Sequence, residues 1–317
     1  MAEQSIWIEK YRPRTFGEIK GQDVVVSKIR AFVEQKNLPH LLFAGPAGVG
    51  KSTLAVVIAK TLFGESWRDN FIEFNASDER GIDVVRNKVK DFARTRAIGD
   101  VPFKIIFLDE CDALTKEAQQ ALRRTMEKYS GSCRFILAAN YSSKIIDPIQ
   151  SRCAVFKFRP VKDADMLELA KSVVQKEGLD VDSDALNALV EIAGGDCRKM
   201  KNTLQSCAVL GEKITADLVF DLASVARPAE LKGVLESAIN GDFVKAKDGL
   251  LAVMLKYGLS GVDLIKQIQK LVWDLGVSDK EKVAMVDKCG EIEFRMVEGA
   301  DEFVQLEALL AYFSSLK

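Results

Sequence analysis

The sequence is poor in the residues that build zinc sites and disulfide frameworks. It contains one histidine, His40, and its six cysteines show no C-x-x-C spacing. Both kinds of site need clustered or regularly spaced side chains, so neither is expected here. His40 stands in "LPHLLF", at the start of an apolar run, where we expect a packed or half-exposed imidazole without a chemical role.

Long hydrophobic runs and a strong net charge are also missing. No apolar stretch approaches the roughly 20 residues that span a bilayer, and "MAEQSIWIEKYRPR" lacks the apolar core and cleavage site of a secretory leader. We therefore expect an intracellular protein without a membrane partner. The formal net charge is −1, so any contact with nucleic acid must come from local clusters of Lys and Arg.

The composition is that of a folded globular protein. With 48% hydrophobic and 29% charged residues, the 317-residue chain should form two or three domains. Between about residues 40 and 160, short β-rich apolar runs alternate with helical patterns. The runs span 40–45, 71–76, 104–110, 134–140 and 154–158. This alternation predicts an α/β domain whose parallel sheet is covered by helices on both faces.

Two breaks at proline divide the remainder. After 159–160 the apolar residues recur every three or four positions, and a Gly-Gly pair at 194–195 separates two predicted helices. After 227–228, further helices follow to the end. The predicted domains are 1–160 (α/β), 161–226 (helical) and 227–317 (helical). The last helix carries one apolar face, which fits a core at least as well as a subunit contact. That face is formed by Phe303, Leu306, Leu309 and Leu310.

A glycine-rich motif follows the first apolar run. "GPAGVGKS", residues 45–52, fits G-x-x-x-x-G-K-[ST], follows a predicted strand and opens a predicted helix. Glycines let backbone N–H groups approach phosphate oxygens, Lys51 brings charge to the β and γ phosphates, and Ser52 reaches Mg²⁺. We expect ATP and Mg²⁺ to bind here. The predicted binding residues are Gly45, Pro46, Ala47, Gly48, Val49, Gly50, Lys51, Ser52 and Thr53.

Two acidic residues follow the apolar run "KIIFL". Asp109 would orient the metal, and Glu110 would polarise the attacking water as a general base. Neighbouring acids at a strand end can also be ordinary exposed side chains, but the phosphate loop upstream favours the catalytic interpretation. Cys111 has no histidine to activate it, so we expect a small buried residue.

Two further polar residues follow or precede predicted strands. Asn140 ends "RFILAAN" and would hold the lytic water, although Asn is also common in turns. Arg152, in "SRC", precedes the last strand. It fits either a surface ion pair or an arginine that acts on the nucleotide of a neighbouring subunit.

The segment 80–96 is predicted as a basic helix. It contains six basic and two acidic residues, a net charge of +4. Ile82, Val85, Val89 and Phe92 would face inward, and Arg86, Lys90 and Arg94 recur every fourth residue beside them. A solvated basic face and a nucleic-acid surface both fit this pattern. The following loop, 97–103, would end that helix with exposed apolar residues, and Ile98 or its neighbours fit local packing and a partner contact about equally.

Seven segments together resemble the small subunits of replication factor C, a family of AAA+ clamp loaders. They are "WIEKYRP" (7–13), the phosphate loop, "NASDERG" (75–81), "FLDECDALT" (107–115), "SRC" (151–153), "GGDCRK" (194–199) and "EGADEFVQLEALLA" (298–311). The resemblance runs nearly end to end and implies an ATPase domain, a helical lid and a helical collar, in that order. Cys111 departs from the alanine common in the D-E-x-D box, which leaves the carboxylates unaffected.

The resemblance implies roles that spacing alone does not assign. Arg152 would be the arginine finger, Asn140 sensor 1, and Arg198, in the lid, sensor 2. The adenine and ribose pocket would be lined by Tyr11, Arg12 and Pro13 with Val24 or Val25. The DNA backbone would be followed by Arg80, Arg86, Lys90 and Arg94, with Arg80 coupling DNA to Glu110, and Ile98 or its neighbours would touch the clamp.

The implied function is ATP-driven opening of a sliding clamp (PCNA) and its loading onto primer–template DNA. DNA binding would be independent of base sequence and sensitive to salt. The implied partners are a large subunit and further small subunits in a heteropentamer. The compact length favours an archaeal source and a cytoplasmic location, with a nuclear one if the source is eukaryotic.

Two alternatives remain open. Another AAA+ DNA-associated ATPase, of the helicase or origin-recognition type, would be expected to carry a C-terminal winged helix. A subunit that binds ATP only to hold an assembly together would not need Glu110, Asn140 and Arg152.

Overall fold

The computed structural model describes residues 6–77, 88–99, 101–211 and 213–316. It divides into two compact units, one of Met1–Asp180 with Leu189–Gln205 and one of Val181–Ala188 with Ser206–Lys317. The division passes within two helices, α10 (Ser183–Ala193) and α11 (Cys197–Val209). The sequence predicted boundaries after residues 160 and 226 instead, and that three-domain division stays a prediction.

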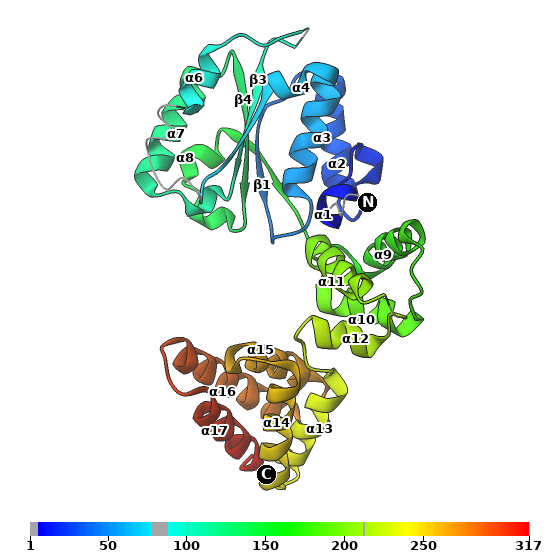
Figure 1. The fold of residues 1–317 in the computed structure, drawn as a ribbon. Helices are drawn as coiled ribbons and strands as arrows, with labels where there is room; N and C mark the ends of the chain where they lie inside the picture. Colours follow the sequence, from blue (N-terminus) through cyan, green and yellow to red (C-terminus); the bar gives the residue numbers. More distant parts are fainter. Residues whose placement is uncertain (1–5, 78–87, 100, 212, 317) are drawn as a thin grey trace. The chain divides into compact units, whose positions relative to one another are not determined.

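A five-stranded parallel sheet forms the centre of the first unit, in the order β2-β3-β4-β1-β5 (Figure 1). All neighbouring strands are parallel. The strands are β1 (His40–Ala44), β2 (Phe71–Asn75), β3 (Lys104–Asp109), β4 (Cys133–Ala139) and β5 (Cys153–Lys157). The predicted α/β class is confirmed. Because the strands are parallel, the segments that leave their carboxyl ends meet at one edge of the sheet.

Helices cover both faces of this sheet (Figure 1). One face carries α2 (Asp23–Glu34), α3 (Lys51–Phe63) and α4 (Trp67–Asn70), and the other carries α6 (Lys88–Arg94), α7 (Lys116–Lys128) and α8 (Asp147–Gln150).

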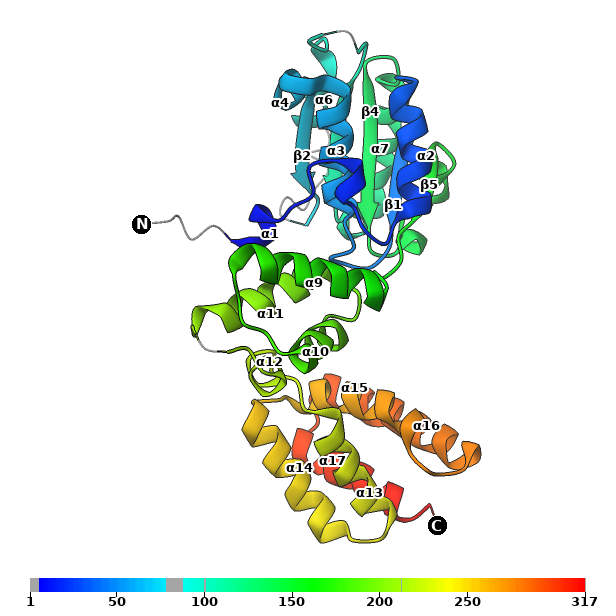
Figure 2. The ribbon, with the colours of Figure 1, turned by 90° about the vertical axis from the view of Figure 1, so that its right-hand side faces the viewer.

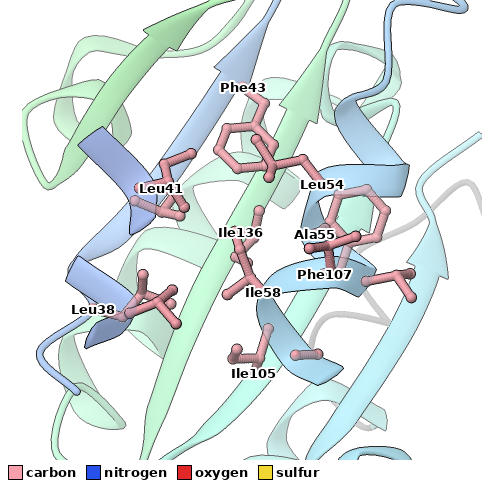
Figure 3. Close-up of a cluster of buried hydrophobic side chains, with 14 of the residues drawn as sticks. Leu38, Leu41, Phe43, Leu54, Ala55, Ile58, Ile105, Phe107 and Ile136 are labelled. Atoms are coloured by element: carbon pink, nitrogen blue, oxygen red, sulfur yellow. The ribbon is translucent and has the colours of Figure 1, made fainter. Parts of the chain in front are cut away.

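Successive residues of the strands enter cores on opposite faces. Leu41 and Phe43 belong to the cluster under α2 and α3, whereas Leu42 belongs to the cluster under α7. Figure 3 shows Leu54 and Ile58 of α3 over the strand residues of the first cluster. A strand buried on both faces needs apolar residues at every position, which explains the continuous hydrophobic runs.

His40 has a structural role. Its Nδ1 accepts a hydrogen bond from the Phe135 N–H at 3.1 Å, and its ring meets the Phe135 ring edge-on. Burial lowers the pKa of His40 to about 4, so the imidazole is neutral near pH 7.

The six cysteines are free thiols. Cys111 is only 1% exposed, and its Sγ donates to the Leu108 carbonyl oxygen at 3.1 Å. Burial raises the pKa of its thiol, as expected of a packed rather than a reactive cysteine.

The N-terminal segment lies beside helices in the last part of the first unit (Figure 2). Its short helix α1 (Trp7–Lys10) approaches both α9 (Asp163–Glu177) and α11. The Trp7 N–H donates to Gln205 Oε1 at 2.9 Å, and Lys10 Nζ lies 2.6 Å from Glu177 Oε1.

The second unit is helical throughout its described residues, apart from one isolated bridge between Val181 and Ile214. Its remaining helices are α12 (Ala216–Leu222), α13 (Pro228–Ile239), α14 (Phe243–Tyr257), α15 (Gly261–Leu271), α16 (Asp279–Val297) and α17 (Glu302–Ser314). Pro228 occupies the first turn of α13, where its missing N–H costs nothing. Ser278 and Glu281 form a capping box on α16.

The apolar face of α17 is mostly core. Leu306, Leu309 and Leu310 are buried, but Phe303 is 49% exposed. The predicted four-residue face therefore has three buried residues. Phe303 lies in the first turn of α17. No helix in the described ranges is long and apolar enough to cross a membrane.

Candidate active site

A pocket of about 680 Å³ lies in the first unit, where the phosphate loop leaves β1. Residues 47–53 of the loop line it, together with the ends of β3 and β4, the N-terminal segment and helices α9 and α11. Many of the predicted site residues meet here. Those outside the loop are Tyr11, Arg12, Pro13, Asp109, Glu110, Asn140 and Arg198.

Two predicted pocket residues lie elsewhere. Val25 is 8% exposed and belongs to the core under α2, and Val24 is 70% exposed. Neither lines the pocket. The assignment of Val24 or Val25 to the adenine and ribose pocket stays a prediction: α2 turns one side chain into the core and its neighbour to the surface.

Lys51 is the buried cation of the pocket. Its Nζ donates to the carbonyl oxygens of Gly45 (2.6 Å) and Pro46 (2.7 Å) and to Asn140 Oδ1 (3.1 Å). Gly45 and Pro46 do not line the pocket, but their carbonyl oxygens hold the Lys51 ammonium. Burial lowers the pKa of Lys51, an effect that the carboxylates of Asp109 and Asp112 oppose. A phosphate that reaches Lys51 would replace these neutral acceptors with a charged one.

The two acidic residues after β3 have different surroundings. Asp109 is half-buried, and its Oδ1 accepts the Glu110 N–H at 2.9 Å. Burial raises the pKa of Asp109, whereas that hydrogen bond and Lys51 oppose the rise. Glu110 is exposed and has left-handed backbone angles, φ 52° and ψ 38°. A non-glycine residue in this conformation carries strain of the kind that clusters at active sites.

Asn140 is held at its backbone by the same acidic segment. Its N–H donates to Asp112 Oδ1 at 3.2 Å, while its side-chain oxygen accepts from Lys51. These contacts connect the ends of β3 and β4 to the phosphate loop. They place an amide where it can order a water beside the loop.

Helix α11 is attached directly to the phosphate loop. The Cys197 N–H donates to the Gly48 carbonyl oxygen at 3.1 Å. Asp196 caps the helix, because its Oδ1 accepts the N–H groups of Arg198 (2.8 Å) and Lys199 (3.0 Å). Gly48 has φ +71°, and a Cβ there would lie 1.7 Å from Asp196 Oδ1. Only glycine allows this close approach.

Replacing Gly48 by alanine is expected to lower the free energy of unfolding by about 2–3 kcal/mol, since it adds left-handed strain and displaces a helix cap. Gly131→Ala is the matched control, because Gly131 has no positive φ and open space around it. Urea unfolding of both variants measures the difference. Equal stabilities would contradict the contact between Gly48 and Asp196.

Arg198 lies on the first turn of α11 and lines the pocket with an exposed side chain. It is close enough to influence the pKa values of Lys51 and Asp109. The structure thus brings Arg198 to the phosphate side of the pocket.

Arg152 lies at the opposite edge of the sheet. β5 pairs with β1 from His40 opposite Cys153 to Ala44 opposite Lys157. The phosphate loop leaves the carboxyl end of β1, and Arg152 precedes the amino end of β5. Five strand residues, about 16 Å, separate the two ends. Arg152 Nη2 lies 2.6 Å from Glu127 Oε1 on α7, and Nη1 donates to the Pro148 carbonyl oxygen at 2.7 Å.

Only part of the predicted basic helix is described. Arg80 and Arg86 lie outside the described residues, as do Ile82 and Val85. Within α6, Val89 is fully buried and Phe92 partly buried, as predicted, whereas Arg94 is exposed and Lys90 half-buried. Arg94 Nη1 lies 3.8 Å from Asp91 Oδ1.

The loop after α6 is less exposed than predicted. Ile98 is 56% exposed, but Val101 and Phe103 are buried in the core. Asn70 holds the loop, accepting the Ile98 N–H at 2.8 Å and donating to its carbonyl oxygen at 2.7 Å. The expectation of exposed apolar residues is therefore corrected for Val101 and Phe103, whereas Ile98 is exposed as expected.

Several pocket residues were missed by sequence reasoning. Helix α9 contributes Glu168, Leu169, Ser172, Val173 and Lys176, and α11 contributes Lys201. No local signal distinguishes the α9 residues from those of other amphipathic helices. Lys201 had one available signal, because a residue three positions after Arg198 shares its helical face.

The pocket suits a magnesium ion. Ser52 and Asp109 both line it, and hydroxyl and carboxylate oxygens are the hard donors that Mg²⁺ takes together with substrate phosphates.

Two family models match the chain. "ATPase family associated with various cellular activities (AAA)" matches residues 41–161, and "Replication factor C C-terminal domain" matches residues 226–312. The phosphate loop, Asp109, Glu110, Asn140 and Arg152 fall within the first match, and helices α13 to α16 within the second.

Curated relatives match over the full length. A replication factor C small subunit of Archaeoglobus fulgidus is 53% identical over 316 residues, covering 100% of this chain and 99% of the relative. One of Methanococcus maripaludis is 52% identical over 314 residues, covering 99% of this chain and 100% of the relative.

Among solved structures, the RuvB Holliday junction branch migration motor of Thermotoga maritima has a TM-score of 0.57 at 19% identity. It covers 72% of this chain and 79% of that one. At this identity the likeness is one of fold. The family is shown instead by the relatives, which are about half identical over the full length, and by the two family models, which match successive parts of the chain. The chain is an ATPase of the AAA type and belongs to the family of replication factor C small subunits.

Proposed function

We propose that this chain is a clamp-loader subunit that uses ATP binding and hydrolysis to open a sliding clamp and load it onto primer–template DNA. Its partners would be a large subunit, further small subunits, the clamp (PCNA) and DNA bound without base specificity. The domains would be the predicted ones, with residues 1–160 as ATPase, 161–226 as lid and 227–317 as collar.

Different pocket residues would have different roles in ATP hydrolysis. Loop 45–53 would hold the phosphates with Lys51, and Ser52 and Asp109 would hold Mg²⁺, which neutralises charge on the phosphates when bound. Glu110 would take the proton of the attacking water, which Asn140 positions. Tyr11, Arg12 and Pro13 would cover the adenine and ribose. Arg198 would couple the position of α11 to the number of phosphates on the bound nucleotide.

The position of Arg152 carries the proposal. An arginine at the far edge of the sheet cannot reach the phosphate loop of its own chain, yet it lies on the surface with a side chain that is 38% exposed. If Arg152 is a finger, it completes the site of a neighbouring subunit. ATP hydrolysis would then depend on assembly, as clamp loading requires.

The helices after residue 227 provide a surface for such an assembly. Val244, Leu251 and Leu255 of α14 are 68%, 40% and 73% exposed. Their spacing of seven and four residues places them on one helical face. Exposed apolar faces of this kind mark protein contacts, which supports the proposed collar role.

DNA binding is proposed for Arg80, Arg86, Lys90 and Arg94. Support within the described residues is limited to α6, where Arg94 and Lys90 lie beside the buried Val89. Phosphate contacts of this kind make binding salt-dependent and independent of base sequence. Ile98 is the proposed clamp contact near this helix.

A loading assay tests the proposed function. The chain would be assembled with the large subunit and clamp of its own organism, and ATP turnover would be measured with and without primed circular DNA. We expect clamp and DNA together to stimulate turnover and the clamp to remain on the circle only when ATP is supplied. Linearising the circle is the control, because a loaded ring then slides off.

The proposal would be contradicted if clamp and DNA did not change ATP turnover and no clamp remained on the DNA circle. A helicase-type activity would instead appear as ATP-dependent strand separation. The residues from 228 to 316 form helices and contain no winged helix, which disfavours that alternative.

A further inference from the structure

Lys201 is a buried lysine in the nucleotide pocket. It lies on α11, one turn after Arg198, lines the pocket and is only 8% exposed. Its Nζ donates to the carbonyl oxygen of Tyr11 at 2.8 Å. This hydrogen bond joins the lid helix to the wall proposed for adenine and ribose.

No carboxylate among the described residues lies within 4.0 Å of the Lys201 ammonium. The Tyr11 carbonyl is its single acceptor in those residues, so two of its three donors are unused. Burial lowers the pKa of Lys201, an effect that Cys197 and Glu9 oppose and Arg12 reinforces. A buried ammonium without a counter-charge is costly, and an anionic ligand in the pocket would remove that cost.

The position of Lys201 along the helix indicates which part of a ligand it meets. α11 starts at the phosphate loop, where the Cys197 N–H bonds to the Gly48 oxygen. Lys201 lies four residues further, about 6 Å along the helix axis. Its ammonium is held at Tyr11, whereas Lys51 is held at Gly45 and Asn140. The two cations therefore serve different ends of the pocket.

We propose that Lys201 is a nucleotide-binding residue that donates to the α-phosphate and ribose end of the bound nucleotide. This inference rests on the proposed ATP binding and adds a further cation to it. The β and γ phosphates remain with Lys51. Because the contact is made to a part that ATP, ADP and AMP share, it contributes to affinity without distinguishing among them.

The test is a comparison of Lys201→Met with the unsubstituted chain. Methionine has nearly the length of lysine without its charge. Dissociation constants for ATP, ADP and AMP would be measured by titration calorimetry or with fluorescent analogues. We expect all three affinities to fall by a common factor of about ten, the effect of one hydrogen bond to a charged group.

Two further variants complete the comparison. Lys199→Met changes an exposed lysine on the same helix outside the pocket and should bind like the unsubstituted chain. Lys201→Arg keeps the charge and donors and should recover most of the affinity. A wild-type affinity for Lys201→Met, or a loss confined to ATP, would overturn the proposal.

Hydrogen exchange separates ligand contact from displacement of the N-terminal segment. If Lys201 only held Tyr11, the methionine variant would lose protection at the Trp7 and Tyr11 amides together with its affinity. That result would also overturn the proposal, whereas retained protection with lost affinity supports it. If the unsubstituted chain bound no nucleotide at all, the proposed function itself would fail, which is a distinct result.

Discussion

Replacing Arg152 by alanine is expected to reduce clamp- and DNA-stimulated ATP turnover of the assembled complex by about 10³–10⁵-fold, the range measured for arginine fingers. The physical reason is the sheet. Arg152 precedes β5 at the edge opposite the phosphate loop, so its charge can stabilise only a transition state bound by another subunit. ATP affinity of the isolated chain should not change, because Arg152 does not line its own pocket.

The measurement compares single-turnover hydrolysis and equilibrium ATP binding in the same preparations. Arg30→Ala is the matched control, since Arg30 is exposed on α2 outside the pocket and contacts the Phe16 ring. Mixing Arg152→Ala subunits with Lys51→Ala subunits adds a direct test of action between subunits. Full stimulated turnover by the Arg152 variant would refute the finger assignment.

Glu110→Gln is expected to lower ATP hydrolysis by about 10²–10⁴-fold, the usual contribution of a general base, while ATP binding is retained. Glutamine keeps the shape of the side chain but cannot accept a proton. Glu110 is exposed at the mouth of the pocket, whereas the neighbouring Asp109 is half-buried and paired with the backbone. The substitution therefore removes proton transfer and leaves the proposed metal ligand in place.

The control for this variant is Glu117→Gln, an exposed glutamate in the first turn of α7 that does not line the pocket. Binding and turnover should both stay at the level of the unsubstituted protein. If Glu110→Gln turned over ATP normally, another group would have to be the base. If the unsubstituted complex did not hydrolyse ATP, the chain would be a binding subunit only.

The edge of the sheet that carries the pocket was predictable, because it depends on local sequence patterns of strands and turns. Parallel strands bring the segments after β1, β3 and β4 to one edge, so Lys51, Asp109, Glu110 and Asn140 meet there. A burial pattern that repeats within a few residues is enough to predict each strand. The sequence also suggested that Arg152 acts on a neighbouring subunit. Its distance from the phosphate loop, however, could be known only from the pairing register of β5 with β1.

The walls of the pocket were much less predictable. Val24 and Val25 were expected there and do not line it, whereas five residues of α9 and Lys201 of α11 were not expected and line it. The exposure of Phe303 on α17 was missed for the same reason. An amphipathic pattern shows that a helix has a buried face, but it does not show what covers that face.

The sequence by itself determined the α/β sheet, the phosphate loop and the acidic residues after β3, because spacing and strand pattern are properties of neighbouring residues. Only the tertiary structure decided how the pocket is closed. The bond between Lys201 and Tyr11 joins residues 190 positions apart, and the approach of Asp196 to Gly48 depends on the docking of α11. Such contacts arise from the packing of whole elements, and no local pattern encodes them.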